Sequence, residues 1–230
     1  MCDHVPRRVH GECRRGGIGI RACLRSTFPK GLRVRVSSSA HFMQTEFEAA
    51  FLKIDKAEIR ARLEKVSAKL IYPETLLQRD VFDPPLPIKG GWLRVRREAN
   101  GVTMSLKVVE GNRIEDQKEV ELKIDNYEQG VEFLKSIGAI HKSYQETKRE
   151  LWRLNNVDIT IDTWPGLLPL VEIEGESELL VKQVADILGF DYSNAHFGAV
   201  DVVYEAELGI SKETINSLPI ITFENPPKKL

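Results

Sequence analysis

The sequence predicts an α+β fold: an antiparallel, eight-stranded closed β-barrel with helices packed outside. Strand-like runs follow one another through short turns, and this succession is typical of antiparallel strands. Charged and apolar residues alternate along several of these runs, so one face of the sheet would be charged and the other apolar. So many charged residues on one face need a wet interior. A closed barrel provides that interior and leaves no exposed sheet edge.

The patterned part of the chain begins with a strand at 45–54 and a helix at roughly 56–70. Asp55 can cap this helix, with Glu58 as its capping-box partner three residues on. Apolar residues then recur at helical spacing: Ile59, Leu63, Val66 and Leu70. We expect Tyr72-Pro73 to end the helix.

A group of strands follows, interrupted by a loop at 83–91 that is rich in proline and glycine. Asn100-Gly101 is a common tight-turn dipeptide, and it predicts a hairpin between two of these strands. The strands are expected at 76–82, 92–98, 102–109 and 117–124.

A second helix is expected after Asp125, which can cap it, with Glu128 completing the capping box and Gly138 ending the helix. Its apolar residues are Val131, Leu134 and Ile137. Two strands, at about 140–154 and 157–164, then meet at Asn155-Asn156.

The last strand of the expected barrel spans 169–174, and a third helix spans 177–188 and ends at Gly189. The segment 193–218 has the pattern of short helical pieces. A β-rich stretch at 219–223 and a polar tail follow.

Charge divides the 230-residue chain into two parts. Residues 1–42 contain nine Arg or Lys against two acidic residues, which leaves 24 basic and 32 acidic residues, a net charge of −8, in 43–230. An acidic body argues against general nucleic-acid binding, which depends on surplus Lys and Arg to neutralise phosphates. No apolar run approaches the length of a membrane span. All three cysteines lie in residues 1–42, a usage that fits a reducing, cytoplasmic location.

We expect residues 1–42 to be a disordered extension outside the fold. The segment is rich in Arg and poor in acidic residues, as a transit peptide is. Translation from an upstream start would give the same pattern, because Met43 stands directly before the first patterned strand. The sequence leaves both origins open, and we favour the second.

Charged pairs spaced two residues apart are the main functional signal. Glu46 and Glu48 near the start match Glu172 and Glu174 much later, with Arg94/Arg96 and Glu119/Glu121 between them. In a strand, residues i and i+2 face the same side, while Phe47, Leu93, Val95, Val120 and Ile173 would face the other. Any one pair fits a solvated strand face. Several pairs separated by sign favour a site for a metal and a polyanion.

The ordered set of motifs resembles the CYTH family, named after class IV adenylyl cyclase and thiamine triphosphatase and part of the triphosphate tunnel metalloenzymes. The resemblance covers roughly 43–208 and implies a tunnel domain there, with a C-terminal helix, strand and tail at 209–230. It is carried by Glu46-Phe47-Glu48, Leu93-Arg94-Val95-Arg96, Ser105-Leu106-Lys107, Lys148-Arg149, Thr160-Ile161-Asp162 and Glu172-Ile173-Glu174.

The charges and the resemblance together suggest a role for each group of residues. Carboxylates suit Mg²⁺ or Mn²⁺, and the expected metal ligands are Glu46, Glu48, Glu172 and Glu174. Guanidinium and ammonium groups suit phosphate oxygens, and the expected phosphate-binding residues are Arg94, Arg96, Lys107 and Arg149. Lys148 and Arg149 cannot both face the lumen, and we favour Arg149. The candidate catalytic residues are Asp162, which could instead lie behind the site, and Glu119, which with Glu121 could instead be plain surface.

One residue departs from the family pattern. The opening signature is Glu-x-Glu-x-Lys, and Ala50 stands where the lysine belongs. A cation that would contact phosphate oxygens is therefore missing, which puts rate, substrate choice or catalysis in question.

We expect a metal-dependent enzyme that hydrolyses an inorganic, nucleoside or thiamine triphosphate. One alternative is an adenylyl cyclase that makes cyclic AMP from ATP, and another is a triphosphate-binding module without catalysis. The expected partner is a small molecule bearing a triphosphate, with no nucleic acid or membrane, and the protein would be a monomer or homodimer.

Overall fold

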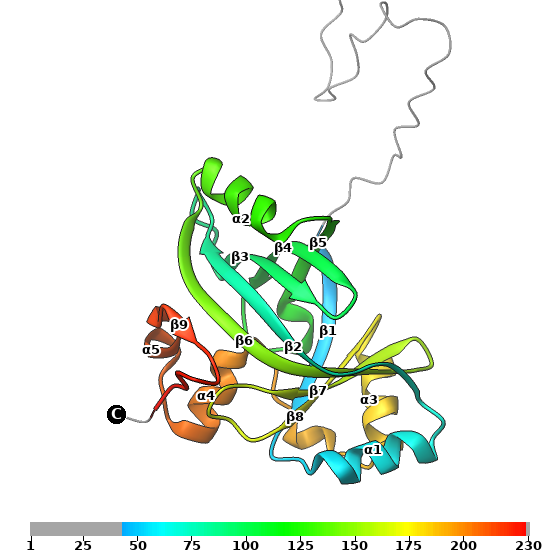
Figure 1. Cartoon of the computed structure of the whole chain (residues 1–230). Helices are drawn as coiled ribbons and strands as arrows, with labels where there is room; N and C mark the ends of the chain where they lie inside the picture. Colours follow the sequence, from blue (N-terminus) through cyan, green and yellow to red (C-terminus); the bar gives the residue numbers. More distant parts are fainter. Residues whose placement is uncertain (1–42, 229–230) are drawn as a thin grey trace, which may run out of the picture. The chain divides into compact units, whose positions relative to one another are not determined.

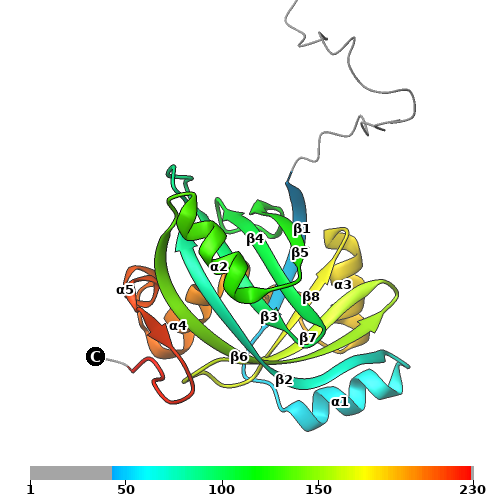
Figure 2. The ribbon, with the colours of Figure 1, turned by 45° about the horizontal axis from the view of Figure 1, so that its top comes forward.

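The computed structural model describes residues 43–228. These residues form a barrel of eight strands with helices on its outside (Figures 1 and 2). The strands are β1 (Gln44–Phe51), β2 (Lys69–Asp83), β3 (Gly91–Glu98), β4 (Gly101–Val109), β5 (Gln117–Ile124), β6 (Ile140–Leu154), β7 (Val157–Thr163), β8 (Leu170–Gly175) and the short β9 (Ile220–Ile221). The helices are α1 (Lys56–Lys65), α2 (Tyr127–Ser136), α3 (Glu178–Ile187), α4 (Val200–Leu208) and α5 (Lys212–Ser217), with 3-10 turns at Ile114–Asp116 and Tyr192–Asn194.

The eight long strands close into a ring. Their order is β2-β3-β4-β5-β1-β8-β7-β6, and β6 pairs with β2 to complete the circle. Every pair in the ring is antiparallel, and the closing pair is the longest, running from Lys69 opposite Arg153 to Asp83 opposite Ile140. Strand β9 adds to β6 in parallel. The predicted closed antiparallel eight-stranded barrel is confirmed.

The apolar core lies between the barrel wall and the helices outside it. Helices α1 and α3 pack on β1, β7 and β8, where Leu63, Ile159, Ile173 and Val181 are fully buried (Figure 1). Helix α2 covers β3 and the end of β2, and α4 and α5 pack around the β7–β8 turn. Of the five residues expected on the apolar face, Val120 is an exception, because it is exposed.

Two of the sequence predictions about helices need correction. The first helix ends at Lys65 rather than near residue 70. Ser67 takes a left-handed conformation (φ 57°), and β2 begins at Lys69, so Leu70 pairs with Trp152 in a strand. The second helix is capped by Asn126, whose side chain accepts a hydrogen bond from the Gln129 amide, and not by Asp125.

The hairpin turns agree with the sequence. Asn155 and Asn156 join β6 to β7 with φ of 51° and 63°, which asparagine tolerates better than most residues. Within residues 43–228, no helix is both long enough and apolar enough to cross a membrane.

Candidate active site

The lumen of the barrel contains a cavity of about 1150 Å³. Its lining includes nine of the ten residues selected from the sequence: Glu46, Glu48, Arg94, Arg96, Lys107, Glu119, Arg149, Glu172 and Glu174. The strand register brings them together, because side chains of directly opposed residues in neighbouring strands lie on the same face. Thus Glu48 is opposite Glu174, and Lys107 is opposite Glu119.

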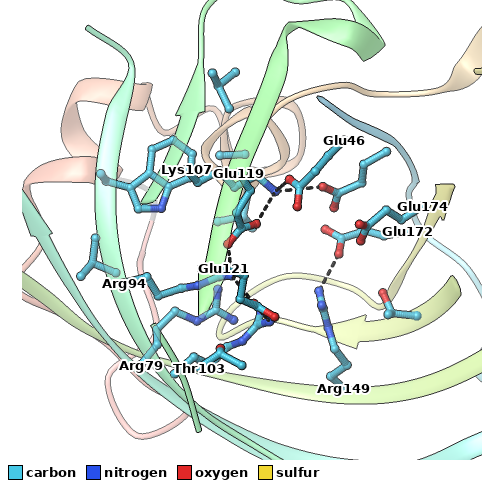
Figure 3. Close-up of a pocket in the computed structure, with 18 of the residues that line it drawn as sticks. Glu46, Arg79, Arg94, Thr103, Lys107, Glu119, Glu121, Arg149, Glu172 and Glu174 are labelled. Atoms are coloured by element: carbon cyan, nitrogen blue, oxygen red, sulfur yellow. Dashed lines mark hydrogen bonds and ion pairs between the residues drawn. The ribbon is translucent and has the colours of Figure 1, made fainter. Parts of the chain in front are cut away.

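Carboxylates gather on the wall formed by β1 and β8 (Figure 3). Lys107 Nζ reaches across from β4 and lies 2.8 Å from Glu46 Oε2 and 3.1 Å from Glu48 Oε2. Burial, together with the charge of the nearby Glu119 carboxylate, raises the pKa of Glu46 to about 8. Burial opposes ionisation of Glu48 as well, but the charges of Lys107 and Arg149 outweigh it and lower the Glu48 pKa.

Arg149 ties β6 to the acidic wall. Its Nη2 lies 2.6 Å from Glu172 Oε2, and its Nε donates to Asp162 Oδ1 at 2.8 Å. Burial and the nearby Glu48 charge nevertheless raise the pKa of Glu172 well above its ordinary value. Burial and Glu48 also raise the pKa of Glu174. These carboxylates are therefore crowded, and additional positive charge would stabilise their ionised forms.

Asp162 does not line the cavity. Its side chain is fully buried behind Arg149, which binds both of its oxygens. This geometry favours the alternative in which Asp162 orients Arg149 and does not touch a substrate. Glu119 does line the cavity. Burial opposes its ionisation, but the Arg94 guanidinium, 2.9 Å away, together with the Lys107 charge and nearby hydrogen-bonding groups, outweighs it and lowers the pKa of Glu119 to about 2.

Basic groups gather on β3 and its neighbours. Arg94 and Arg96 are both about nine-tenths buried and face the lumen from β3. Arg96 Nε donates to Glu98 Oε1 at 2.5 Å, and Glu121 lies within 4 Å of both arginines. Burial and repulsion by Arg94 lower the pKa of Arg96.

The structure shows which of several charged side chains face the lumen. Arg149 faces the lumen, whereas Lys148 is exposed outside the barrel near the Phe223 ring. Glu121 lines the cavity and contacts arginines, so it is not plain surface. Arg79 on β2 lines the cavity too, and the sequence reasoning missed it. Arg79 lies directly opposite Arg96 in the β2–β3 ladder, a register that the sequence alone does not give.

Ala50 also faces the lumen, opposite Glu172. Its backbone exchanges two hydrogen bonds of 2.9 Å with His196, which joins the segment after α3 to the barrel. The position is buried, with 8% of its surface exposed, and it has no side-chain charge to offer to a ligand.

The carboxylates suit a divalent metal by their donor chemistry. Mg²⁺ and Mn²⁺ prefer oxygen ligands, and the raised pKa values of Glu46, Glu172 and Glu174 indicate carboxylates that extra positive charge would stabilise. As the side chains stand in residues 43–228, no group of three or more acidic, His or Cys residues is spaced to hold a metal ion. Lys107 and Arg149 occupy the positions between these carboxylates.

A family model described as the CYTH domain matches residues 44–196, which is most of the barrel. The chain belongs to the CYTH domain family. Members of this family are triphosphatases or adenylyl cyclases, and the family is in general metal-dependent. Among curated proteins, none matches this sequence.

Three of the solved structures that this chain resembles come from two archaea and a bacterium. A conserved hypothetical protein from Pyrococcus furiosus is 24% identical, with a TM-score of 0.55 over 66% of this chain and 95% of its own. A second archaeal protein, from Pyrococcus horikoshii, is 22% identical, with a TM-score of 0.54 over 66% of this chain and 94% of its own. A protein from Vibrio parahaemolyticus that was proposed to be an adenylate cyclase is 12% identical, with a TM-score of 0.61 over 71% of this chain and 99% of its own. At these identities the likeness shows the fold alone.

Proposed function

We propose that this protein hydrolyses a triphosphate with the help of Mg²⁺ or Mn²⁺, and that the reaction takes place in the barrel lumen. The observation that supports this most directly is the separation of charge inside one cavity. Four glutamates lie on β1 and β8, and arginines face them from β2, β3 and β6 (Figure 3). A polyphosphate needs both kinds of wall, because its oxygens bind cations and its bound metal binds carboxylates.

The basic residues would bind and orient the triphosphate. Arg94 and Arg96 present guanidinium groups whose geometry matches phosphate oxygens, and both are already held by carboxylates. Arg149 is held in place by Asp162 and Glu172, so little reorganisation is needed when charge builds up on the phosphoryl group. Asp162 is therefore a positioning residue in this mechanism.

The acidic residues have different protonation states. Glu119 is ionised at neutral pH, so it can accept a hydrogen bond from water and orient it towards the terminal phosphorus. The water oxygen forms a bond to that phosphorus as the bond to the diphosphate leaving group breaks, and the proton that the water loses passes to an oxygen of the released phosphate. Phosphoryl transfer has a loose transition state, so positioning and charge stabilisation suffice without a covalent nucleophile.

Glu46, Glu48, Glu172 and Glu174 are the residues that would hold a divalent ion, whose positive charge would offset that of the phosphates. Lys107 lies close to the position that this ion would take, because its ammonium group contacts Glu46 and Glu48.

Phosphate release from inorganic triphosphate, ATP and thiamine triphosphate, with Mg²⁺ or Mn²⁺, tests the proposal. We expect turnover of at least one of them. Chromatography of the products from ATP separates hydrolysis from cyclisation, because cyclic AMP as the main product identifies an adenylyl cyclase. No turnover of any triphosphate by folded protein would overturn the enzymatic assignment.

Ala50 favours a second candidate, a triphosphate-binding module without catalysis. Residue 50 lies opposite Glu172 in the β1–β8 ladder, but alanine supplies no cation there. Calorimetry that shows tight triphosphate binding by a protein without turnover would support this candidate over the enzyme.

A further inference from the structure

Arg79 lies on the wall of the barrel opposite the glutamates of β1. In the ring of eight strands, β2 is the fourth strand from β1 in either direction. Arg79 points into the lumen from β2, beside Arg94 and across from Glu172 and Glu174 (Figure 3). It is 6% exposed, so its charge is almost wholly removed from bulk water.

Arg79 differs from the other arginines of the cavity in having no carboxylate partner. The other four are each paired, in the combinations Arg94–Glu119, Arg96–Glu98, Arg149–Asp162 and Arg153–Asp158. Within residues 43–228, no ion pair links Arg79 to an acidic group, and its buried Nε has no hydrogen-bond partner. Buried charges in folded proteins are normally paired, so this guanidinium has unused capacity for an anion.

Neutral groups hold Arg79 in place. Its Nη2 donates to Thr147 Oγ1 at 2.7 Å, and its guanidinium carbon lies 4.4 Å from the centre of the Trp164 ring. Thr147 and Trp164 are themselves buried on β6 and just after β7. These contacts fix the orientation of the side chain, but they supply no negative charge.

The electrostatic environment of Arg79 is unfavourable. Burial, and then repulsion by Arg96, Arg94 and Arg149, lower the pKa of the guanidinium well below its ordinary value. Asp162 offsets part of this effect, but Arg149 already binds both of its oxygens. An arginine keeps its proton at neutral pH. The repulsion is therefore present in the folded protein, and a bound anion would relieve it.

We propose that Arg79 is a phosphate-binding residue that holds the part of the triphosphate farthest from the glutamates of β1. This rests on the proposed function and adds a subsite to it. A triphosphate would then span the lumen, with its metal-bound portion at β1 and β8 and another phosphoryl group at β2. Trp164 and Thr147 act as positioning residues for this subsite.

The test compares Arg79→Gln with the unchanged protein in two measurements. Calorimetry with inorganic tripolyphosphate, in buffer with EDTA, is expected to show at least about a tenfold loss of affinity, the usual consequence of losing a charge-assisted hydrogen bond. Thermal unfolding without any phosphate is expected to give an unchanged or higher Tm, because the substitution removes an unpaired buried charge. Arg79→Lys keeps the charge without the planar guanidinium fork. Its affinity for tripolyphosphate should therefore lie between those of the unchanged protein and Arg79→Gln.

Arg97→Gln is the matched control. Arg97 belongs to β3 and also packs over an aromatic ring, with its guanidinium carbon 4.6 Å from the Tyr127 ring centre, but it faces outward and pairs with Glu128. Its substitution should leave tripolyphosphate affinity unchanged.

The outcomes separate the two proposals. Equal tripolyphosphate affinity in Arg79→Gln and the unchanged protein overturns the subsite alone. The subsite is also overturned if Arg79→Gln has a lower Tm in phosphate-free buffer while Arg79→Lys restores the Tm and leaves tripolyphosphate affinity unchanged. That result would assign Arg79 a structural role. If the unchanged protein itself does not bind tripolyphosphate, the subsite is overturned, and the turnover measurements with Mg²⁺ or Mn²⁺ decide the proposed function separately.

Discussion

The proton that burial keeps on Glu46 gives the structure a measurable dependence on pH. Glu46 holds this proton in the folded protein at neutral pH, because its pKa is raised from 4.5 to about 8. Replacing Glu46 with Gln keeps a hydrogen-bond donor towards Glu119 and removes the group that must ionise as the pH rises. We predict that Glu46→Gln makes the protein less sensitive to alkaline pH when divalent metals are absent.

The sign follows from linkage. A carboxyl whose folded pKa lies above its unfolded value contributes stability below pH 4.5, and that contribution disappears as the pH rises through 8. Taken alone, a rise from 4.5 to about 8 corresponds to a loss of about 5 kcal/mol, at about 1.4 kcal/mol for each pKa unit. Glu119 shifts in the opposite direction, from 4.5 to about 2, but its contribution changes only below about pH 4.5 and is constant at higher pH.

Urea denaturation in EDTA at pH 5, 7 and 9 measures the effect. Over this range the free energy of unfolding of the unchanged protein should fall by up to about 4 kcal/mol more than that of Glu46→Gln, because the folded pKa of about 8 lies about three units above pH 5. Other titrating groups are common to both proteins and cancel in the difference. Parallel pH dependences would refute the reasoning, since they would mean that Glu46 titrates in the folded protein as it does in the unfolded chain.

Three further predictions concern the metal, the missing cation and the core. Glu48→Gln should largely abolish the rise in Tm on Mn²⁺ titration, because stabilisation by a bound metal grows with metal affinity. Glu58→Gln, at an exposed position on α1, is the control, and equal responses of the two variants would contradict a metal role for Glu48. Ala50→Lys should raise triphosphate turnover by about tenfold or more, since it adds a cation to the lumen opposite Glu172, and unchanged turnover would show that this charge is not limiting. Ile173→Ala, at a fully buried position, should lower the free energy of unfolding by about 2–5 kcal/mol in urea denaturation, and a smaller loss would mean that the core there collapses to fill the space.

The sequence predicted the barrel because its local signals agree with its global fold. Asn155-Asn156 and Asn100-Gly101 mark hairpins, and the charged alternation identifies the lumen face. The first helix was predicted too long for a definite reason. Val66 and Leu70 continue its apolar spacing, but Leu70 pairs with Trp152 in the closing β2–β6 ladder, and this long-range contact overrides the local pattern.

The site was predictable where charges of one sign recur at i and i+2, and less so elsewhere. Arg79 was missed because its neighbours on the same face, Leu77 and Val81, are apolar, so β2 lacks a charged pair. Asp162 was selected from the sequence as a candidate catalytic residue, but it does not line the cavity, because Arg149 lies over it, and spacing alone does not show this.

The two-residue alternation of the barrel wall also restricts how this chain can change in length. Deleting one residue within β1 would turn Glu46 and Glu48 outward and bring apolar neighbours such as Phe47 into the lumen, because every side chain beyond the deletion changes face. The same holds for β8 around Ile173, which would move from the core to the charged cavity. Length variation among relatives should therefore be confined to connections such as the proline-rich segment between β2 and β3, which lies outside the ladders.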